Sequence, residues 1–164
     1  MSDKNMPVII DIESSGFGHS SYPIEIGLAL ENGKTKCFLI KPEEDWLHWD
    51  KNAAQLHGIS RNQLLKNGKL IRNVCLHLNN LLKGKTVYSD AWSYDQSWLH
   101  LLFSRCNMTL KFRIESLVCL MNEKQMESWG SIKQQLQSKY NVRRHRASHD
   151  ALLLQRTYTE IQTL

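Results

Sequence analysis

The stretch Pro7-Val-Ile-Ile-Asp-Ile-Glu13 is a compact β-branched run that ends in two carboxylates separated by a single isoleucine. β-Branched side chains pack well on a pleated sheet, so we expect a buried strand from Pro7 to Ile12. Side chains alternate between the two faces of a strand, so Asp11 and Glu13 should project on the same side. Ile10 and Ile12 should then point into the opposite packing layer.

Two more strands are expected directly downstream. Residues Ile24 to Leu30 alternate after Tyr22-Pro23, and Thr35 to Ile40 form a further apolar run. The turn Glu31-Asn32-Gly33-Lys34 lies between them, and Asn-Gly suits a tight hairpin. The chain should therefore open with three antiparallel strands.

The rest of the sequence alternates between helical and strand-like segments. Apolar residues from Leu70 to Leu82 recur at helical spacing, and Lys83-Gly84 should end that helix because glycine tolerates a left-handed cap. The other expected elements are a short helix capped by Ser60, strands over Thr86 to Ser89 and Thr109 to Ile114, and helices over Asp95 to Cys106, Glu115 to Met121, Ser131 to Tyr140 and His149 to Ile161. This order predicts an α/β fold with a mixed five-stranded sheet and helices on both faces.

Composition favours an ordinary globular protein. The chain has 164 residues, 41% of them apolar, with no repeat, so we expect a single domain over residues 1–164. The N-terminus lacks the pattern of a signal peptide or membrane helix, which predicts a cytoplasmic protein. The four cysteines are widely separated and do not have zinc-site spacing, which favours reduced thiols. A formal charge of +5 is compatible with a polyanionic partner.

The acidic pair on the first strand is a candidate metal site. Two carboxylates this close on a buried strand repel each other and ionise readily only if a cation compensates them. Oxygen ligands favour Mg²⁺ or Mn²⁺ over zinc. The alternative is that Asp11 and Glu13 are merely solvated at the end of a strand.

A second group of polar residues lies near the C-terminus, in His145-Arg-Ala-Ser-His-Asp150-Ala. Imidazole is well matched to proton transfer near neutral pH, so His145 is a candidate general base, and Asp150 could complete a metal site. The alternative makes Asp150 an ordinary helix-start acid and His145 a loop residue. That alternative explains each residue singly but not their joint appearance.

Five segments in order span nearly the whole chain: Asp11-Ile-Glu13-Ser-Ser-Gly16, Pro23-Ile-Glu-Ile-Gly27, His57-Gly-Ile59, Ser93-Tyr-Asp95 and His145-Arg-Ala-Ser-His-Asp150-Ala. Together they resemble the DEDDh branch of the DnaQ-like 3′→5′ exonucleases, which includes proofreading exonucleases, ribonuclease T and oligoribonuclease. The resemblance implies a ribonuclease H-like fold, consistent with the element order above.

The resemblance also implies the roles of individual residues. Asp11, Glu13 and Asp150 would hold metal, Asp95 would support a second ion, and His145 would be the general base. Two Mg²⁺ or Mn²⁺ ions would then promote hydrolysis of the terminal phosphodiester of single-stranded RNA or DNA to nucleoside 5′-monophosphates. The alternative is a noncatalytic nucleic-acid-binding or polymerase-associated domain of the same fold. Some relatives are homodimers, so a dimer is a further expectation.

The sequence departs from the family pattern at one position. Relatives often carry Asn four residues before the second-motif Asp, and here Ala91 stands there, next to the additional acid Asp90. Asp95 is the preferred ligand because Tyr94-Asp95 and the apolar residues after it match the motif and its helix. The role of Glu25 stays open.

Substrate contacts are expected at three places. The loop residues Ser14, Ser15, Gly16 and Phe17 should approach the terminal nucleotide, with Phe17 stacking on its base. His57 and Arg146 are further candidates, Arg146 together with Arg143 and Arg144 as a grip on phosphates. The alternatives are a plain connecting loop and a solvated basic surface. Trp46, Trp49 and Trp92 could stack on bases, although tryptophans more often pack in the core.

Overall fold

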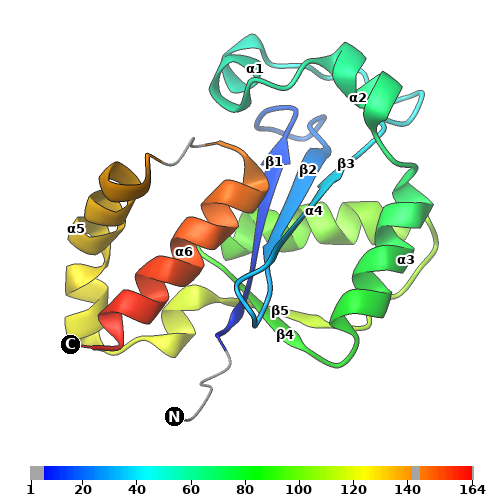
Figure 1. The fold of residues 1–164 in the computed structure, drawn as a ribbon. Helices are drawn as coiled ribbons and strands as arrows, with labels where there is room; N and C mark the ends of the chain where they lie inside the picture. Colours follow the sequence, from blue (N-terminus) through cyan, green and yellow to red (C-terminus); the bar gives the residue numbers. More distant parts are fainter. Residues whose placement is uncertain (1–5, 142–144, 164) are drawn as a thin grey trace.

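The chain forms one mixed β-sheet covered by helices, seen in a computed structural model that describes residues 6–141 and 145–163 (Figure 1). The strands are β1 (Val8–Ser14), β2 (Pro23–Ala29), β3 (Thr35–Leu39), β4 (Thr86–Ser89) and β5 (Arg113–Ser116). Their order is β3-β2-β1-β4-β5. β1, β2 and β3 pair antiparallel, whereas β4 runs parallel to β1 and to β5. The predicted mixed five-stranded sheet is confirmed.

The helices are α1 (Lys51–His57), α2 (Arg61–Asn67), α3 (Ile71–Leu82), α4 (Trp92–Arg105), α5 (Glu123–Tyr140) and α6 (Ala147–Ile161), with a 3-10 turn η1 (Leu117–Leu120) before α5. In Figure 1, α3 and α4 lie on one side of the sheet and α5 and α6 on the other, while α1 and α2 lie together beyond one end. Both faces of the sheet are thus covered, as expected. No helix within the described residues is both long enough and apolar enough to cross a membrane.

The alternation of side chains along β1 separates two cores. Ile10 and Ile12 belong to the larger core, which includes buried residues of α3 and α4 such as Val74 and Leu102. Ile9 points the other way, into a smaller core with Ala29, Leu117, Ala151 and Leu154. Asp11 and Glu13 share the face of Ile9, because each is separated from it by an even number of positions. The first strand therefore presents its acids to the side covered by α6.

Local signals placed several element ends correctly. The Ser60 hydroxyl accepts a hydrogen bond from the Gln63 amide at the start of α2. The hairpin between β2 and β3 turns at Gly33, where φ is +74°. After α3, Gly84 has a φ of +75°, a conformation that favours glycine. Short-range capping and turn chemistry thus govern these three points.

Other elements differ from expectation. Helix α1 was not expected, because the only buried residue among its seven is His57, so it has no apolar repeat. Its ends are set by Asp50, which caps the first turn, and by the left-handed Gly58. Helix α4 begins at Trp92 rather than Asp95, and α6 begins at Ala147 rather than His149. Helix α5 begins at Glu123 rather than Ser131, because Asn122 and Gln125 form a capping box.

The last strand is shifted relative to its expected range, Thr109 to Ile114. Buried Asn79 on α3 donates to the Thr109 carbonyl (2.9 Å) and accepts from the Lys111 amide (2.8 Å). These backbone groups are therefore bonded to a side chain, and β5 starts only at Arg113. The helix expected over Glu115 to Met121 is instead the end of β5 followed by η1, a consequence of the same shift.

Candidate functional site

The acids of β1 are paired with β2 residues, and the start of α6 packs against the same part of β2. Asp11 is paired with Gly27, and Glu13 with Glu25. A Cβ at Gly27 would lie only 2.0 Å from the Ala147 carbonyl carbon, so α6 begins directly on the backbone of β2. This close approach brings the C-terminal polar segment to the acidic end of β1.

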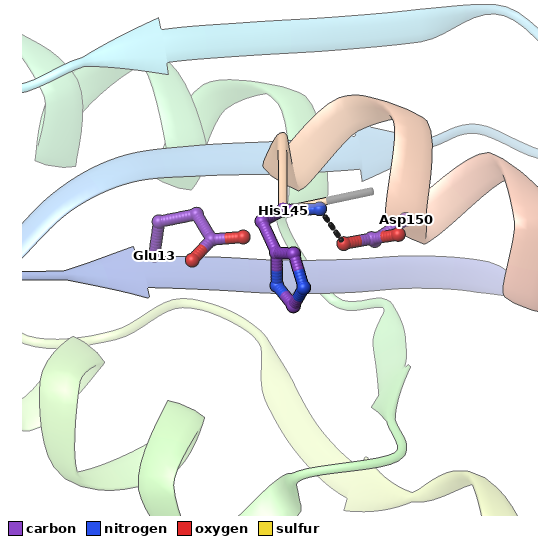
Figure 2. A group of neighbouring side chains, drawn as sticks. All are labelled: Glu13, His145 and Asp150. Carbon is purple, nitrogen blue, oxygen red and sulfur yellow. Dashed lines mark hydrogen bonds between the residues drawn. The ribbon is translucent and has the colours of Figure 1, made fainter. Parts of the chain in front are cut away.

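Three predicted site residues meet there. One ligand atom from each of Glu13, His145 and Asp150 lies within 4.8 Å of the others, an arrangement able to hold a metal ion. Figure 2 shows the imidazole of His145 between the two carboxylates, and the backbone amide of His145 donates to Asp150 Oδ2 (2.8 Å). Strand β1 thus supplies one donor, the residue two positions before α6 supplies the second, and the first turn of α6 supplies the third.

Asp95 joins this acidic region from the first turn of α4, with only 2% of its surface exposed. Burial raises its pKa to about 8; the hydrogen bond from Ser89 Oγ (2.6 Å) opposes that rise, and the charges of Asp90 and Glu13 reinforce it. The Ser89 oxygen also accepts from the Ala91 amide (2.9 Å). Ser89, which the sequence did not single out, therefore orients the Asp95 carboxyl.

Asp11 is the residue on which the charges of the other nearby acids act together. Burial raises its pKa well above the usual range, and the charges of Asp95, Glu13, Asp150 and Asp90 raise it further. So many carboxyls in one place are costly to ionise unless cations neutralise them. This donor set of carboxylate oxygens with one imidazole is able to bind a divalent cation.

The segment before α6 is held by Glu25, whose side chain is fully buried. Its carboxylate accepts from Arg146 Nη2 (2.6 Å), from the Ala147 amide (3.0 Å) and from the Cys37 thiol (3.0 Å). His145, just before this anchor, has a φ of +61°, a left-handed conformation uncommon outside glycine. Glu25 therefore has a structural part in placing His145.

The Arg146 side chain is bound within the fold, which differs from the free phosphate grip that was expected. The Arg146 guanidinium is bound to Glu25, and 27% of its side chain remains exposed. Its expected contact with substrate stays a prediction. Arg143 and Arg144 lie outside the described residues.

The loop after β1 carries an exposed aromatic ring. Phe17 is 75% exposed, and its ring lies edge-on to that of Tyr94, 58% exposed, with centroids 6.0 Å apart. Tyr94 directly precedes Asp95 on α4, and Phe17 follows Glu13 by four positions, so the two rings come from segments that also carry acids of the site. Sequence reasoning proposed stacking for Phe17 but not for Tyr94; the available signal for Tyr94 was an aromatic residue directly before the predicted ligand.

His57 is buried, with 2% of its surface exposed, and its Nδ1 accepts from the Ile59 amide (3.0 Å). Burial lowers its pKa, and its ring lies edge-on to Trp49. In the structure His57 packs inside the fold. Its expected contact with substrate stays a prediction.

The other tryptophans are also engaged within the fold. Trp46 stacks on Tyr22 in the core (centroids 4.9 Å apart), and the Trp92 indole donates to the Ile114 carbonyl (3.1 Å).

Asp90, the additional acid, forms an ion pair with Lys133 of α5 (3.0 Å).

Comparison with solved structures identifies the fold. A structure of exonuclease I superposes with a TM-score of 0.74 at 13% identity, over 98% of this chain and 41% of that chain. E. coli exonuclease I in complex with a dA16 oligonucleotide gives 0.73 at 13% identity, with the same coverage. The zinc-bound form of the E. coli exonuclease I complex with single-stranded DNA gives 0.63 at 14% identity, over 97% of this chain and 39% of that chain.

The chain thus has the ribonuclease H-like exonuclease fold of these proteins. The chain spans about two fifths of the length of the exonuclease I chain. No family model matches the sequence, and no curated protein matches it either.

Proposed function

We propose that this protein is a metal-dependent 3′→5′ exonuclease that releases nucleoside 5′-monophosphates from single-stranded RNA or DNA. The observation that carries the proposal is the convergence of Glu13, His145 and Asp150 at one point, with Asp11 and Asp95 electrostatically coupled to the same region. These donors come from three separate parts of the chain, and a fold has no structural need to gather so many carboxyls.

Each side chain has a part in the proposed reaction. Asp11, Glu13 and Asp150 hold the cations, with Asp95 supporting a second ion. Two Mg²⁺ or Mn²⁺ ions would supply positive charge that favours attack of water on the terminal phosphodiester. His145 takes the proton of the attacking water, a task that suits an imidazole at neutral pH.

A pair of exposed aromatic rings supports a single-stranded end as the substrate. Phe17 and Tyr94 offer two exposed rings on which an unpaired base can stack, and stacking is tolerant of sequence. The structural neighbours include exonuclease I bound to dA16 and dT13 oligonucleotides. Stacking does not distinguish the two sugars, so both RNA and DNA are included in the proposal.

The test is cleavage of 5′-labelled single-stranded RNA and DNA of matched sequence, with Mg²⁺, Mn²⁺ or EDTA. We expect a ladder that shortens from the 3′ end, requires metal, and is absent for Asp150→Asn. A circular single strand is the control for endonuclease activity and should stay intact. Tight binding without any cleavage would contradict the proposal and favour a noncatalytic binding domain. Light scattering of the same sample tests the expected homodimer.

A further inference from the structure

Ser15 is bonded to two other segments at the point where the chain leaves β1. It is buried, with 1% of its surface exposed. Its amide donates to the Tyr22 carbonyl (2.8 Å), and its carbonyl accepts from the Asp50 amide (2.9 Å). Its hydroxyl accepts from the Tyr22 amide (3.1 Å) and lies 3.0 Å from His48 Nδ1. The base of the loop that carries Phe17 is thus tied to the segment before α1.

The hydrogen-bond pattern gives His48 the role of acceptor. A serine hydroxyl has one proton to donate, and the Ser15 oxygen already accepts a proton from Tyr22. Among the residues that the structure describes, no other acceptor for the Ser15 hydroxyl is seen. The arrangement that satisfies all of these groups has Nδ1 unprotonated and the ring proton on Nε2, an assignment made from the network.

The His48 ring also packs on the loop itself. A Cβ at Gly16 would lie 2.7 Å from His48 Cε1 and 2.7 Å from Asp50 Cβ, and Gly16 has a φ of +145°. The ring therefore touches the backbone directly before Phe17. Only glycine permits this approach, because any side chain would displace the imidazole.

His48 itself stands on a well-supported segment. Two residues later, the Asp50 carboxylate caps α1 by accepting from the amides of Asn52 (2.7 Å) and Ala53 (3.0 Å). Trp49, which lies between His48 and Asp50, packs edge-on against buried His57. An imidazole held from this side can keep the loop in one position without contacting the acids.

We propose that His48 is a positioning residue that holds the Ser15-Gly16-Phe17 bend, so that Phe17 meets the terminal base opposite Tyr94. The inference rests on the proposed function and names a residue that acts on nucleotide binding. Loss of the Ser15–His48 bond leaves Asp11, Glu13, Asp95, His145 and Asp150 in place. Its effect should therefore fall on KM and leave kcat nearly unchanged.

Three variants separate positioning from general packing. His48→Leu removes the acceptor, His48→Asn keeps an oxygen near the position of Nδ1, and His100→Leu changes an exposed histidine of α4 as a control. With a single-stranded oligonucleotide, we expect His48→Leu to raise KM about three- to tenfold, the value of one neutral hydrogen bond. The kcat should change less than about twofold, and His48→Asn should recover most of the loss. A fall in kcat at unchanged KM, or failure of His48→Asn to rescue, would overturn the inference.

A readout without turnover keeps this inference separate from the proposed nuclease. Binding of a 5′-fluorescein oligothymidylate in EDTA, measured by anisotropy, should weaken in His48→Leu by the same factor as KM rises. Amide hydrogen exchange should accelerate at Tyr22 and Asp50, whose amides are bonded to Ser15. A wild type that binds but does not cleave contradicts the nuclease alone. Unchanged exchange at both amides, or a wild type that does not bind the oligonucleotide, overturns the role of His48.

Discussion

Arg146 and Glu25 form an ion pair across 121 positions of sequence, with Arg146 Nη2 2.6 Å from Glu25 Oε1 and Arg146 Nε 3.1 and 3.2 Å from the two carboxylate oxygens. The pair joins β2 to the segment that carries His145 and Asp150. Because Glu25 also accepts from the Ala147 amide, it sets where α6 begins. An acid outside the metal-binding group therefore helps to place two members of the proposed site.

Glu25→Gln should destabilise the protein and reduce cleavage. Replacement leaves the Arg146 guanidinium without its counter-charge; since Arg146 is partly exposed, we expect a loss of about 2–3 kcal/mol, less than for a fully buried pair. Chemical unfolding at pH 7 measures the loss. Glu31→Gln, which removes the partly exposed partner of Lys85, is the control and should cost under about 1 kcal/mol. Equal losses in the two variants would contradict the anchoring role of Glu25.

The same residue predicts a dependence of stability on pH. Burial by itself would raise the pKa of Glu25, but hydrogen bonds from Arg146, Cys37 and the Ala147 amide outweigh burial and leave the pKa below its usual 4.5. A depressed pKa adds stability above the unfolded value, and this stability is lost as the pH falls through the folded value. Wild type should thus lose more stability than Glu25→Gln when unfolding is compared at pH 6 and at about pH 3. Parallel losses in both would show that Glu25 is not the titrating group.

Asp95→Asn should stabilise the metal-free protein at alkaline pH. Burial raises the pKa of Asp95 from 3.8 to about 8, so its contribution is fully present below the unfolded value and is lost as the pH rises toward 8. In EDTA, the unfolding free energy of wild type should therefore fall from pH 4 to pH 8 more steeply than that of Asp95→Asn. The amide oxygen of Asn can still accept from Ser89, so the two proteins differ at this position only in the ability to ionise. Identical slopes would refute the assignment of this pH dependence to Asp95.

Added Mg²⁺ or Mn²⁺ should stabilise wild type more than Asp95→Asn, the opposite of the order expected in EDTA at alkaline pH. A cation that binds only the folded protein stabilises it by mass action, so wild type should gain stability with rising metal concentration. Asp95→Asn should gain less, because it has lost one carboxylate of the group. Thermal unfolding across a metal titration measures both gains, and no stabilisation of wild type by either ion would contradict the proposed metal site.

Gly27→Ala should displace the start of α6. Its Cβ would lie 2.0 Å from the Ala147 carbonyl carbon and 2.1 Å from the Ser148 nitrogen, both backbone atoms that cannot rotate away. We expect a loss of at least about 1–3 kcal/mol, the usual cost of overpacking, and little remaining cleavage. Gly130→Ala in α5 is the control, since a Cβ there meets nothing within 4 Å, and alanine should stabilise that helix by about 1 kcal/mol. A stable and active Gly27→Ala protein would contradict the close approach.

Phe17→Ala and Tyr94→Ala should weaken substrate binding without affecting the fold, because both rings are exposed. Stacking contributes about 1–3 kcal/mol per base, so KM should rise about 5- to 150-fold for Phe17→Ala, with a smaller change in kcat. Because the two rings contact each other, the double variant should lose less than the product of the single effects. The control is Leu76→Ala, which truncates a partly exposed side chain on α3 and should leave KM unchanged. Unaltered KM for Phe17→Ala would remove the stacking role.

Much of the fold was predictable from local patterns. The alternation along β1 and β2, the Asn-Gly hairpin, the apolar repeat of α3 and the Ser60 cap each depend on a few neighbouring residues. Helix α1 and the start of β5 were missed for the opposite reason. Helix α1 has no apolar stripe, and the start of β5 depends on Asn79, more than thirty positions earlier.

For this protein the sequence by itself determined that Asp11 and Glu13 face one side of a buried strand, because the strand period of two is a local property of the backbone. The C-terminal segment from His145 to Asp150 also identified these two residues as candidates for the site. Only the tertiary structure decided that Glu25 anchors Arg146, that Tyr94 faces Phe17, and that His48 bonds Ser15. Those relationships depend on how β2, α4 and the segment before α1 pack together. No residue's local propensity encodes which distant side chain it will meet.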